Sequence, residues 1–161
     1  MPKLEIETAI QGTLPGAVQK NALAFIGYLR ASGMEFERAG GYWKNQLYWF
    51  VTYKNEPVCY ILINGFGPEE KFYPWTVWSD DSGSDWFDYP PIEESMKKIA
   101  WNHIDFCENC GGGCSPGSRK TVFGKQFNHV CRTAMRFINP EGDTLEFIKK
   151  LVEIRKLNIR S

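Results

Sequence analysis

The sequence lacks an excess of charge of either sign. Its 19 Lys and Arg residues equal its 19 Asp and Glu residues, so the formal net charge at pH 7 is zero. A neutral chain has no overall electrostatic field that would attract it to nucleic acid or to an anionic membrane surface. We therefore expect neither nucleic acid nor a membrane as a partner.

Long apolar runs are also missing. The longest such run, Val58 to Ile63, has the length of a strand, whereas a membrane-spanning helix needs about 18 apolar residues. The first residues, MPKLEIETAIQG, carry charges where a secretory signal peptide has its apolar segment. These two absences predict a cytoplasmic protein.

Histidine is scarce, and cysteine is present in an odd number. The chain has two His and five Cys residues, and no Ser-His-Asp order or nucleophile elbow stands out. Thiols stay reduced in the cytoplasm, and an odd count leaves at least one cysteine without a partner. A structural disulfide framework is therefore not expected.

Four of the five cysteines are instead candidates for a metal site. Three lie in the run C-E-N-C-G-G-G-C, and the fourth opens a later predicted strand. Short C-x₂₋₄-C spacing is a common way to supply thiolates to a tetrahedral zinc ion. The surrounding segment has few apolar side chains, and a metal would provide the crosslink that such a segment lacks. The sequence predicts a structural zinc site at Cys107, Cys110, Cys114 and Cys131, with His103 and His129 as substitute ligands.

Three other interpretations of these cysteines remain open. They could be free thiols that pack as small apolar residues. They could hold an iron–sulfur cluster, although their spacing matches neither of the common ferredoxin patterns. Cys107 and Cys110 could also form a redox pair, although the motif follows a predicted helix and runs into glycines. Cys59 alternates with aromatic residues in a predicted strand and is expected to lie in the core.

The hydrophobic pattern predicts an α+β fold. Apolar residues at steps of three and four predict helices over residues 17–31, 92–103 and 140–157, the last capped by Asn139. Strands are expected at 34–38, 46–53, 58–63, 72–78 and 131–138, with a shorter one at 121–123. Residues 1–15 look like an arm or an edge strand. We expect a single domain over residues 1–161: a mostly antiparallel sheet of about five strands, three helices packed on it, and a Cys/Gly-rich excursion at 104–131.

Aromatic residues are abundant, with six Trp, seven Tyr and eleven Phe, and many fall on adjacent predicted strands. Alternation places Trp49, Val51 and Tyr53 on one face of their strand and Tyr48 and Phe50 on the other. One face should meet the first long helix, and the other should be covered or bind a ligand. The candidate ligand-binding residues are Trp49, Tyr53, Tyr60, Trp75, Trp78 and Trp86.

The acidic segment around Trp86 suggests a ligand class. Asp80, Asp81, Asp85 and Asp88 accompany that aromatic residue, and carboxylates beside aromatic rings suit a cationic or amine ligand. A solvated acidic turn is the simpler interpretation of the same residues.

A resemblance accompanies this pattern. At residues 23–78, a helix is followed by G-M-E-F and then by Y-W-K-N-Q-L-Y-W-F-V-T-Y-K-N-E-P-V-C-Y-I-L-I. This order is similar to that of small uncharacterised bacterial domains, in which helices precede and follow an antiparallel sheet. The resemblance covers about a third of the chain. It implies an α+β fold and a bacterial cytoplasmic source, and it implies no activity.

These observations lead to one functional expectation and two rivals. The first is a non-enzymatic, zinc-stabilised module whose aromatic sheet face binds a small ligand or a protein partner. The second is an enzyme that uses a cysteine thiolate for redox chemistry or thiol transfer. The third is a structural subunit whose aromatic face forms a homodimer interface.

Overall fold

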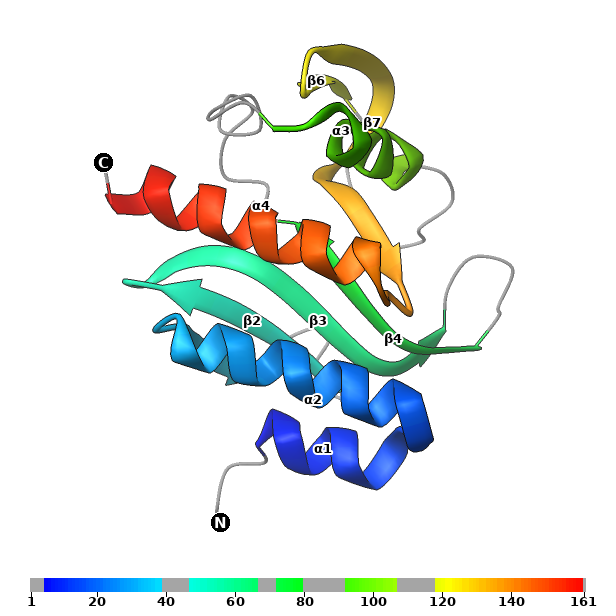
Figure 1. Ribbon diagram of the computed structural model, residues 1–161, viewed down its shortest axis with the longest axis vertical. Coiled ribbons are helices and arrows are strands. Elements are labelled where there is room, and N and C mark those ends of the chain that lie inside the picture. The colour runs from blue at the N-terminus through cyan, green and yellow to red at the C-terminus, as the bar shows by residue number, and fades with distance from the viewer. Residues whose placement is uncertain (1–4, 39–46, 67–71, 80–91, 107–117, 161) are drawn as a thin grey trace.

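The computed structural model describes residues 5–38, 47–66, 72–79, 92–106 and 118–160. Its described helices are α1 (Ile6–Thr13), α2 (Gly16–Ala31), α3 (Glu94–Asn102) and α4 (Asp143–Arg160). Its described strands are β1 (Glu35–Arg38), β2 (Leu47–Tyr53), β3 (Glu56–Phe66), β4 (Phe72–Ser79), β5 (Ile104–Phe106), β6 (Ser118–Val122) and β7 (Lys125–Ile138). Figure 1 shows the long helices lying against the sheet, with β6, α3 and part of β7 at one end.

The α+β class and the antiparallel sheet are confirmed, but the expected counts are wrong. The described residues form four helices and seven strands, rather than three helices and about five strands. The strand order is β1-β2-β3-β4-β7-β5, with β6 paired to β7, and every described pairing is antiparallel. None of the described helices is long and apolar enough to cross a membrane.

The extra helix, α1, occupies residues that were expected to form an arm or an edge strand. Its buried side chains are Ile6, Ala9 and Ile10, which lie on one helical face. The helix has only eight residues and includes Gly12, so its own helical propensity is weak. Packing against α2 and β3 therefore stabilises it, and sequence periodicity over so short a stretch does not reveal this.

The extra strands come from the two ends of the predicted cysteine excursion. β5 and β6 were expected to be irregular, except at 121–123, and β7 begins at Lys125 rather than at Cys131. The strand β7 is long and irregular, because His129 and Ala134 have positive φ angles of 57° and 63°. Such residues break the alternation of side chains that the sequence prediction assumed.

Asn139 does not cap the last helix. It has a positive φ of 47°, and its backbone N–H donates to the carbonyl oxygen of Trp75 at 2.8 Å. The chain therefore still belongs to the sheet at this point, and α4 begins later, at Asp143. Pro74 of β4 cannot donate a ladder hydrogen bond, which suits an edge or a bulge. The pairing of β4 with β7 covers Thr76 to Trp78, so Pro74 lies outside the part of β4 that has described strands on both sides.

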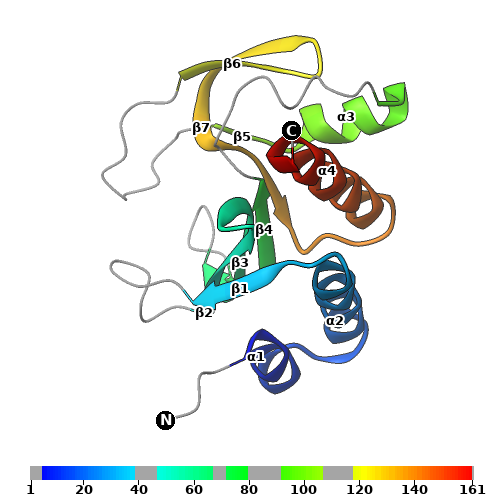
Figure 2. The same cartoon turned by 90° about the vertical axis from the view of Figure 1, so that its left-hand side faces the viewer.

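The main core lies between the sheet and the helices. Figure 2 shows β1 to β4 on one side and α1, α2 and α4 on the other. The largest fully buried side chains in this layer are Trp49, Trp75, Phe25, Phe137 and Phe147. Cys59 belongs to the same core, as its place in the strand predicted. These contacts fix which face of the sheet meets the helices and which face does not.

Candidate functional site

The face of the sheet opposite the described helices carries a second, smaller apolar cluster. It consists of the buried residues Tyr48 and Leu62, with Phe50, Tyr60 and Trp78 packed around them. We call these five residues the aromatic face. The opposite face of the same strands, β2, β3 and β4, packs in the main core, because successive side chains of a strand point to opposite faces. No described helix contributes to this cluster.

Strand register aligns the aromatic face into a row across the sheet. Phe50 pairs with Tyr60, and Tyr60 pairs with Trp78. The row continues to Glu37 of β1 at one end and to Arg136 of β7 at the other. Paired residues in neighbouring antiparallel strands lie on the same face, so three aromatic side chains lie between a carboxylate and a guanidinium.

The rings of the aromatic face contact one another closely. The Tyr48 centroid lies 5.7 Å from Phe50, 6.4 Å from Tyr60 and 5.8 Å from Trp78. Phe50 and Tyr60 meet edge to face, with centroids 5.5 Å apart and an interplanar angle of 77°. Tyr48 is the buried centre, while Phe50, Tyr60 and Trp78 retain exposed surface. The cluster is therefore a packed platform of rings with accessible outer parts.

The six predicted ligand-binding residues do not form one site. Trp49 and Trp75 are 1% and 0% exposed and pack in the core on the helix side. Tyr53 also lies on that side, where Lys156 of α4 approaches its ring to 5.0 Å. Tyr60 and Trp78 belong to the aromatic face. Trp86 lies outside the described residues, as do the four aspartates around it.

An acidic groove adjoins the aromatic face at β1. It has a volume of about 260 Å³ and is lined by Glu35, Phe36, Glu37, Thr52 and Asn55. Glu35 pairs with Thr52 and Glu37 pairs with Phe50, so both carboxylates belong to the same face as the row of rings. The alternation E-F-E-R places the two glutamates on one face of their strand, but it does not show which strand lies opposite, so the sequence alone did not identify them.

The charges around this face are unequal. Glu35 and Glu37 have no ion-pair partner within the described ranges. In contrast, Nε of Arg136 lies 3.8 Å from Oδ1 of the buried Asp105. Arg38 of β1 lies on the helix side, with its guanidinium 5.7 Å from the Trp49 ring. The described part of the face therefore carries a net negative charge at its β1 end.

The predicted metal ligands lie mainly outside the described residues. This applies to Cys107, Cys110 and Cys114, and nothing is described of the Cys131 side chain. Within the described ranges, no three His, Cys, Asp or Glu side chains are grouped so that they could hold a metal ion. The metal hypothesis must therefore be judged from the backbone that flanks these cysteines.

That backbone converges on Val130. Phe106 of β5 precedes Cys107 in the chain and is the Cα partner of Val130 in β7. Ser118, the first residue of β6, is also a Cα partner of Val130. A strand residue has one neighbour on each edge, so β5 and β6 lie on opposite edges of β7 at this position. Cys131 follows Val130 directly. The segment that contains Cys107, Cys110 and Cys114 therefore starts and ends beside the residue that precedes Cys131.

The two substitute ligands have different surroundings. Nδ1 of His103 lies 2.7 Å from the carbonyl oxygen of Ile99. A carbonyl can only accept, so Nδ1 carries the hydrogen and the neutral ring keeps its lone pair on Nε2. The His103 ring also lies 5.0 Å from the Phe137 ring. His129 is exposed at its positive-φ position on β7. In this tautomer, Nε2 is the nitrogen through which His103 could bind a metal.

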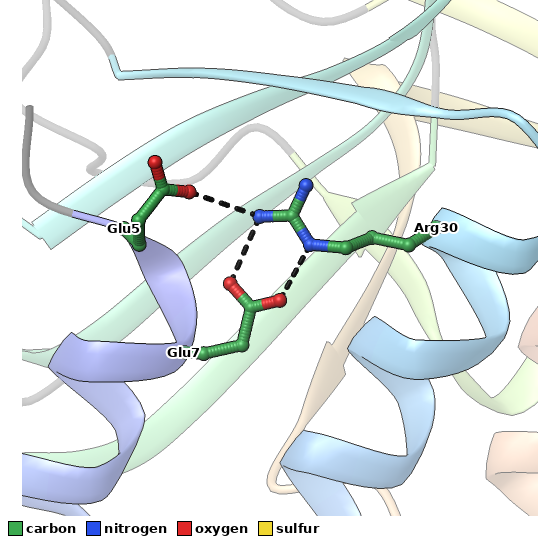
Figure 3. Close-up of polar contacts among 3 residues, drawn as sticks. All are labelled: Glu5, Glu7 and Arg30. Atoms are coloured by element: carbon green, nitrogen blue, oxygen red, sulfur yellow. Dashed lines mark hydrogen bonds and ion pairs between the residues drawn. The ribbon is translucent and has the colours of Figure 1, made fainter.

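Arg30 of α2 forms a charge cluster with two carboxylates at the start of α1 (Figure 3). Its Nη2 lies 3.1 Å from Oε2 of Glu5 and 2.9 Å from Oε1 of Glu7, and its Nε donates to the other Glu7 oxygen. These hydrogen bonds hold the pKa of Glu7 below its usual range. The guanidinium also lies 4.6 Å from the Phe36 centroid. The cluster is exposed and joins α1 to α2 and β1, so we interpret it as structural.

A small cavity lies between the sheet and α4. It is lined mainly by apolar side chains, including Val58, Val77 and Leu151, together with Cys59 and Ser79. Its volume of about 10 Å³ is at the lower limit for one water molecule. It is therefore a packing defect rather than a ligand site.

Comparison with known proteins yields no relative for this arrangement. No family model matches the chain. No curated protein and no solved structure matches it either.

Proposed function

We propose that this protein is a non-enzymatic binding module that presents its aromatic face to a small ligand or a protein partner. The observation that carries the proposal is the row of Phe50, Tyr60 and Trp78 on the sheet face that no described helix covers. Clustered aromatic surface outside a main core is typical of interaction sites. The adjoining groove adds polar groups that can orient a ligand.

A ligand screen tests this proposal. We expect compounds that raise the melting temperature of the wild-type protein to lose that effect in Phe50→Leu and Trp78→Leu variants. Leu157→Ala is the matched control, because Leu157 is 57% exposed and lies on α4. Stabilisation that is unchanged in both aromatic-face variants would show that binding takes place elsewhere.

Zinc stabilisation is the second part of the proposal. Cys107, Cys110, Cys114 and Cys131 would hold the ion, with His103 or His129 replacing a cysteine that points away. The pairing of both Phe106 and Ser118 with Val130 supports this, because it brings the ends of the cysteine segment to the strand that carries Cys131. Thiolate and imidazole donors suit zinc, which would crosslink a segment with little apolar surface.

Elemental analysis of the purified protein tests the metal. We expect about one equivalent of zinc, in line with a single four-ligand site. Cys110→Ser should lose it, whereas Cys59→Ser should keep it, because Cys59 lies in the core. Metal-free protein with a rapidly alkylated thiol would instead support the cysteine-dependent enzyme. A stable dimer that dissociates in Trp78→Leu would support the structural subunit.

A further inference from the structure

The charge of the chain is separated along the sequence. Residues 109–140 contain no Asp or Glu and five cationic side chains: Arg119, Lys120, Lys125, Arg132 and Arg136. Because the total charge is zero, the remaining residues carry five more carboxylates than cations. In Figure 1, β6 and the part of β7 that pairs with it lie at one end of the molecule. Overall neutrality, from which we expected no nucleic-acid partner, therefore conceals a local cationic region.

The hairpin between β6 and β7 is anchored at its turn. The turn residues, Phe123 and Gly124, have positive φ angles of 48° and 86°, as the common two-residue hairpin turn requires. The Phe123 ring is buried and lies 6.2 Å from the Phe147 ring of α4. The Val122 carbonyl oxygen accepts a hydrogen bond of 2.8 Å from the indole of Trp101 in α3. The hairpin is therefore a preorganised surface, and its turn has no exposed Phe123 ring that could insert into a lipid bilayer.

One face of this hairpin combines cations with aromatic rings. Lys120 is the Cα partner of Phe127, and Lys125 lies two residues before Phe127, so the three side chains share a face. The Lys125 ammonium lies 5.3 Å from the Trp101 ring and 5.5 Å from the Phe127 ring. The Phe106 ring of β5 lies 6.3 Å from the Phe127 ring, and Phe106 is 44% exposed. An accessible aromatic ring therefore lies close to a lysine ammonium.

Two cations of the hairpin keep their charge available. Within the described ranges, neither Arg119 nor Lys125 forms an ion pair. Nε of Arg119 donates to Oδ1 of Asn128 at 3.2 Å, and this neutral amide orients the side chain without cancelling its charge. Arg136, in contrast, is paired with the buried Asp105. The hairpin therefore offers positive charge that attracts a polyanion.

We propose that this hairpin binds a single strand of nucleic acid, with a backbone phosphate at Lys125 and a base stacked on the exposed part of Phe106. Lysines that contact phosphates and aromatic rings that stack on bases are the two elements of single-strand recognition. An acidic peptide would satisfy the lysine but would offer no base to the ring, and the bases of a duplex are already stacked. The site shares no residue with the aromatic face, so it goes beyond the proposed function.

Fluorescence anisotropy of a labelled oligothymidylate of about 12 nucleotides, titrated with the full chain, tests the proposal. An abasic strand of the same length carries the same phosphates without bases. We expect the oligothymidylate to bind at least about fivefold more tightly than the abasic strand, because stacking of one base on an aromatic ring contributes at least that factor. The affinity should fall as the NaCl concentration rises, because phosphate contacts release counterions.

Two variants separate the phosphate contact from the base contact. Lys125→Gln should weaken binding of both strands and reduce the slope of log affinity against log salt concentration by about 0.7, the contribution of one single-strand phosphate. Phe106→Leu should weaken binding of the oligothymidylate at least about fivefold and leave that of the abasic strand unchanged. Lys20→Gln and Leu157→Ala are the matched controls, because Lys20 on α2 and Leu157 on α4 are exposed and lie outside the cationic segment. Both controls should keep the wild-type affinities.

Several outcomes would overturn the proposal. Equal affinity for the two strands, or a preference for polyglutamate or for a duplex of the same length, would reduce the hairpin to a general cationic surface. Binding that survives both Lys125→Gln and Phe106→Leu would place the strand elsewhere on the protein. Absence of binding at about 50 mM NaCl would exclude the interaction, because phosphate contacts are strong at low salt. None of these outcomes bears on the aromatic face, which the ligand screen with the Phe50 and Trp78 variants tests separately.

Discussion

The Tyr28 hydroxyl lies 3.4 Å from Oε1 of Glu153, so a side chain of α2 contacts the charged face of α4. The same hydroxyl lies 3.2 Å from the carbonyl oxygen of Lys149. Burial raises the pKa of Tyr28 to about 12, and the negative charge of Glu153 adds to this effect. The neutral phenol is therefore the form that the folded state favours.

This raised pKa predicts a loss of stability in alkali. The unfolded chain loses the Tyr28 proton near pH 10, whereas the folded protein keeps it until about pH 12. The contribution of Tyr28 to the free energy of unfolding is fully present below pH 10 and is lost as the pH rises through the pKa of Tyr28 in the folded protein. We expect the free energy of unfolding to fall more steeply between pH 10 and 12 in the wild type than in Tyr28→Phe. Denaturant titrations across this range measure it, and parallel slopes would contradict the assignment.

Glu7 predicts the opposite behaviour in acid. Its pKa is lowered by the hydrogen bonds from Arg30, so the folded state binds fewer protons than the unfolded chain. The contribution of the pair is present above the ordinary carboxyl pKa of about 4.5 and is lost as the pH falls through the lower folded value. Glu7→Gln should therefore flatten the dependence of unfolding free energy on pH below about 4.5. Glu56→Gln is the control, and an equal flattening in both variants would contradict the role of Arg30.

Two substitutions of Trp75 should differ in how much they lower the free energy of unfolding. Trp75→Ala removes a fully buried side chain and should lower the free energy of unfolding by about 3–5 kcal/mol. Trp75→Phe should cost less than about 1.5 kcal/mol, because the buried indole Nε1 has no hydrogen-bond partner within the described part of the chain, and Phe removes that unpaired donor. Urea denaturation measures both. A cost for Trp75→Phe close to that of Trp75→Ala would mean that the indole N–H is paired.

Ala134 tests the irregularity of β7. It is fully buried and has a φ of 63°, a region that costs a non-glycine residue about 1–2 kcal/mol. Ala134→Gly relieves this strain but loses one buried methyl group, worth about 0.8 kcal/mol, so stability should change by less than about 1 kcal/mol. Ala134→Val adds volume and β-branching and should cost at least about 2 kcal/mol. A large loss with Gly would show that the backbone here is ordinary strand.

The sequence predicted which side chains share a face of a strand or helix where the local hydrophobic pattern was regular. The alternation around Trp49 placed it opposite Tyr48 and Phe50, and the apolar stripe of α2 identified the face that meets the sheet. The prediction did not say which aromatic face the helices cover, because that depends on contacts between distant segments. Trp49 and Trp75 therefore entered the candidate site although they are core residues.

Other features could not be predicted from the sequence, because they depend on packing between distant segments. α1 is too short to form a convincing periodic pattern, and its position depends on α2 and β3. β5 has only three residues, and its strand character comes from pairing with β7. The acidic groove arises from the register of β1 against β2, which aligns Glu37 with Phe50. No local pattern encodes that register by itself.

Val130 has a consequence for engineering this chain. Because Phe106 and Ser118 both pair with it, they are separated by about two strand spacings, or about 10 Å. A Gly-Ser bridge of about six residues can cover that distance, including the passage over the strand. Such a bridge in place of residues 107–117 would therefore remove three of the proposed zinc ligands while leaving the end of β5 and the start of β6 at neighbouring points.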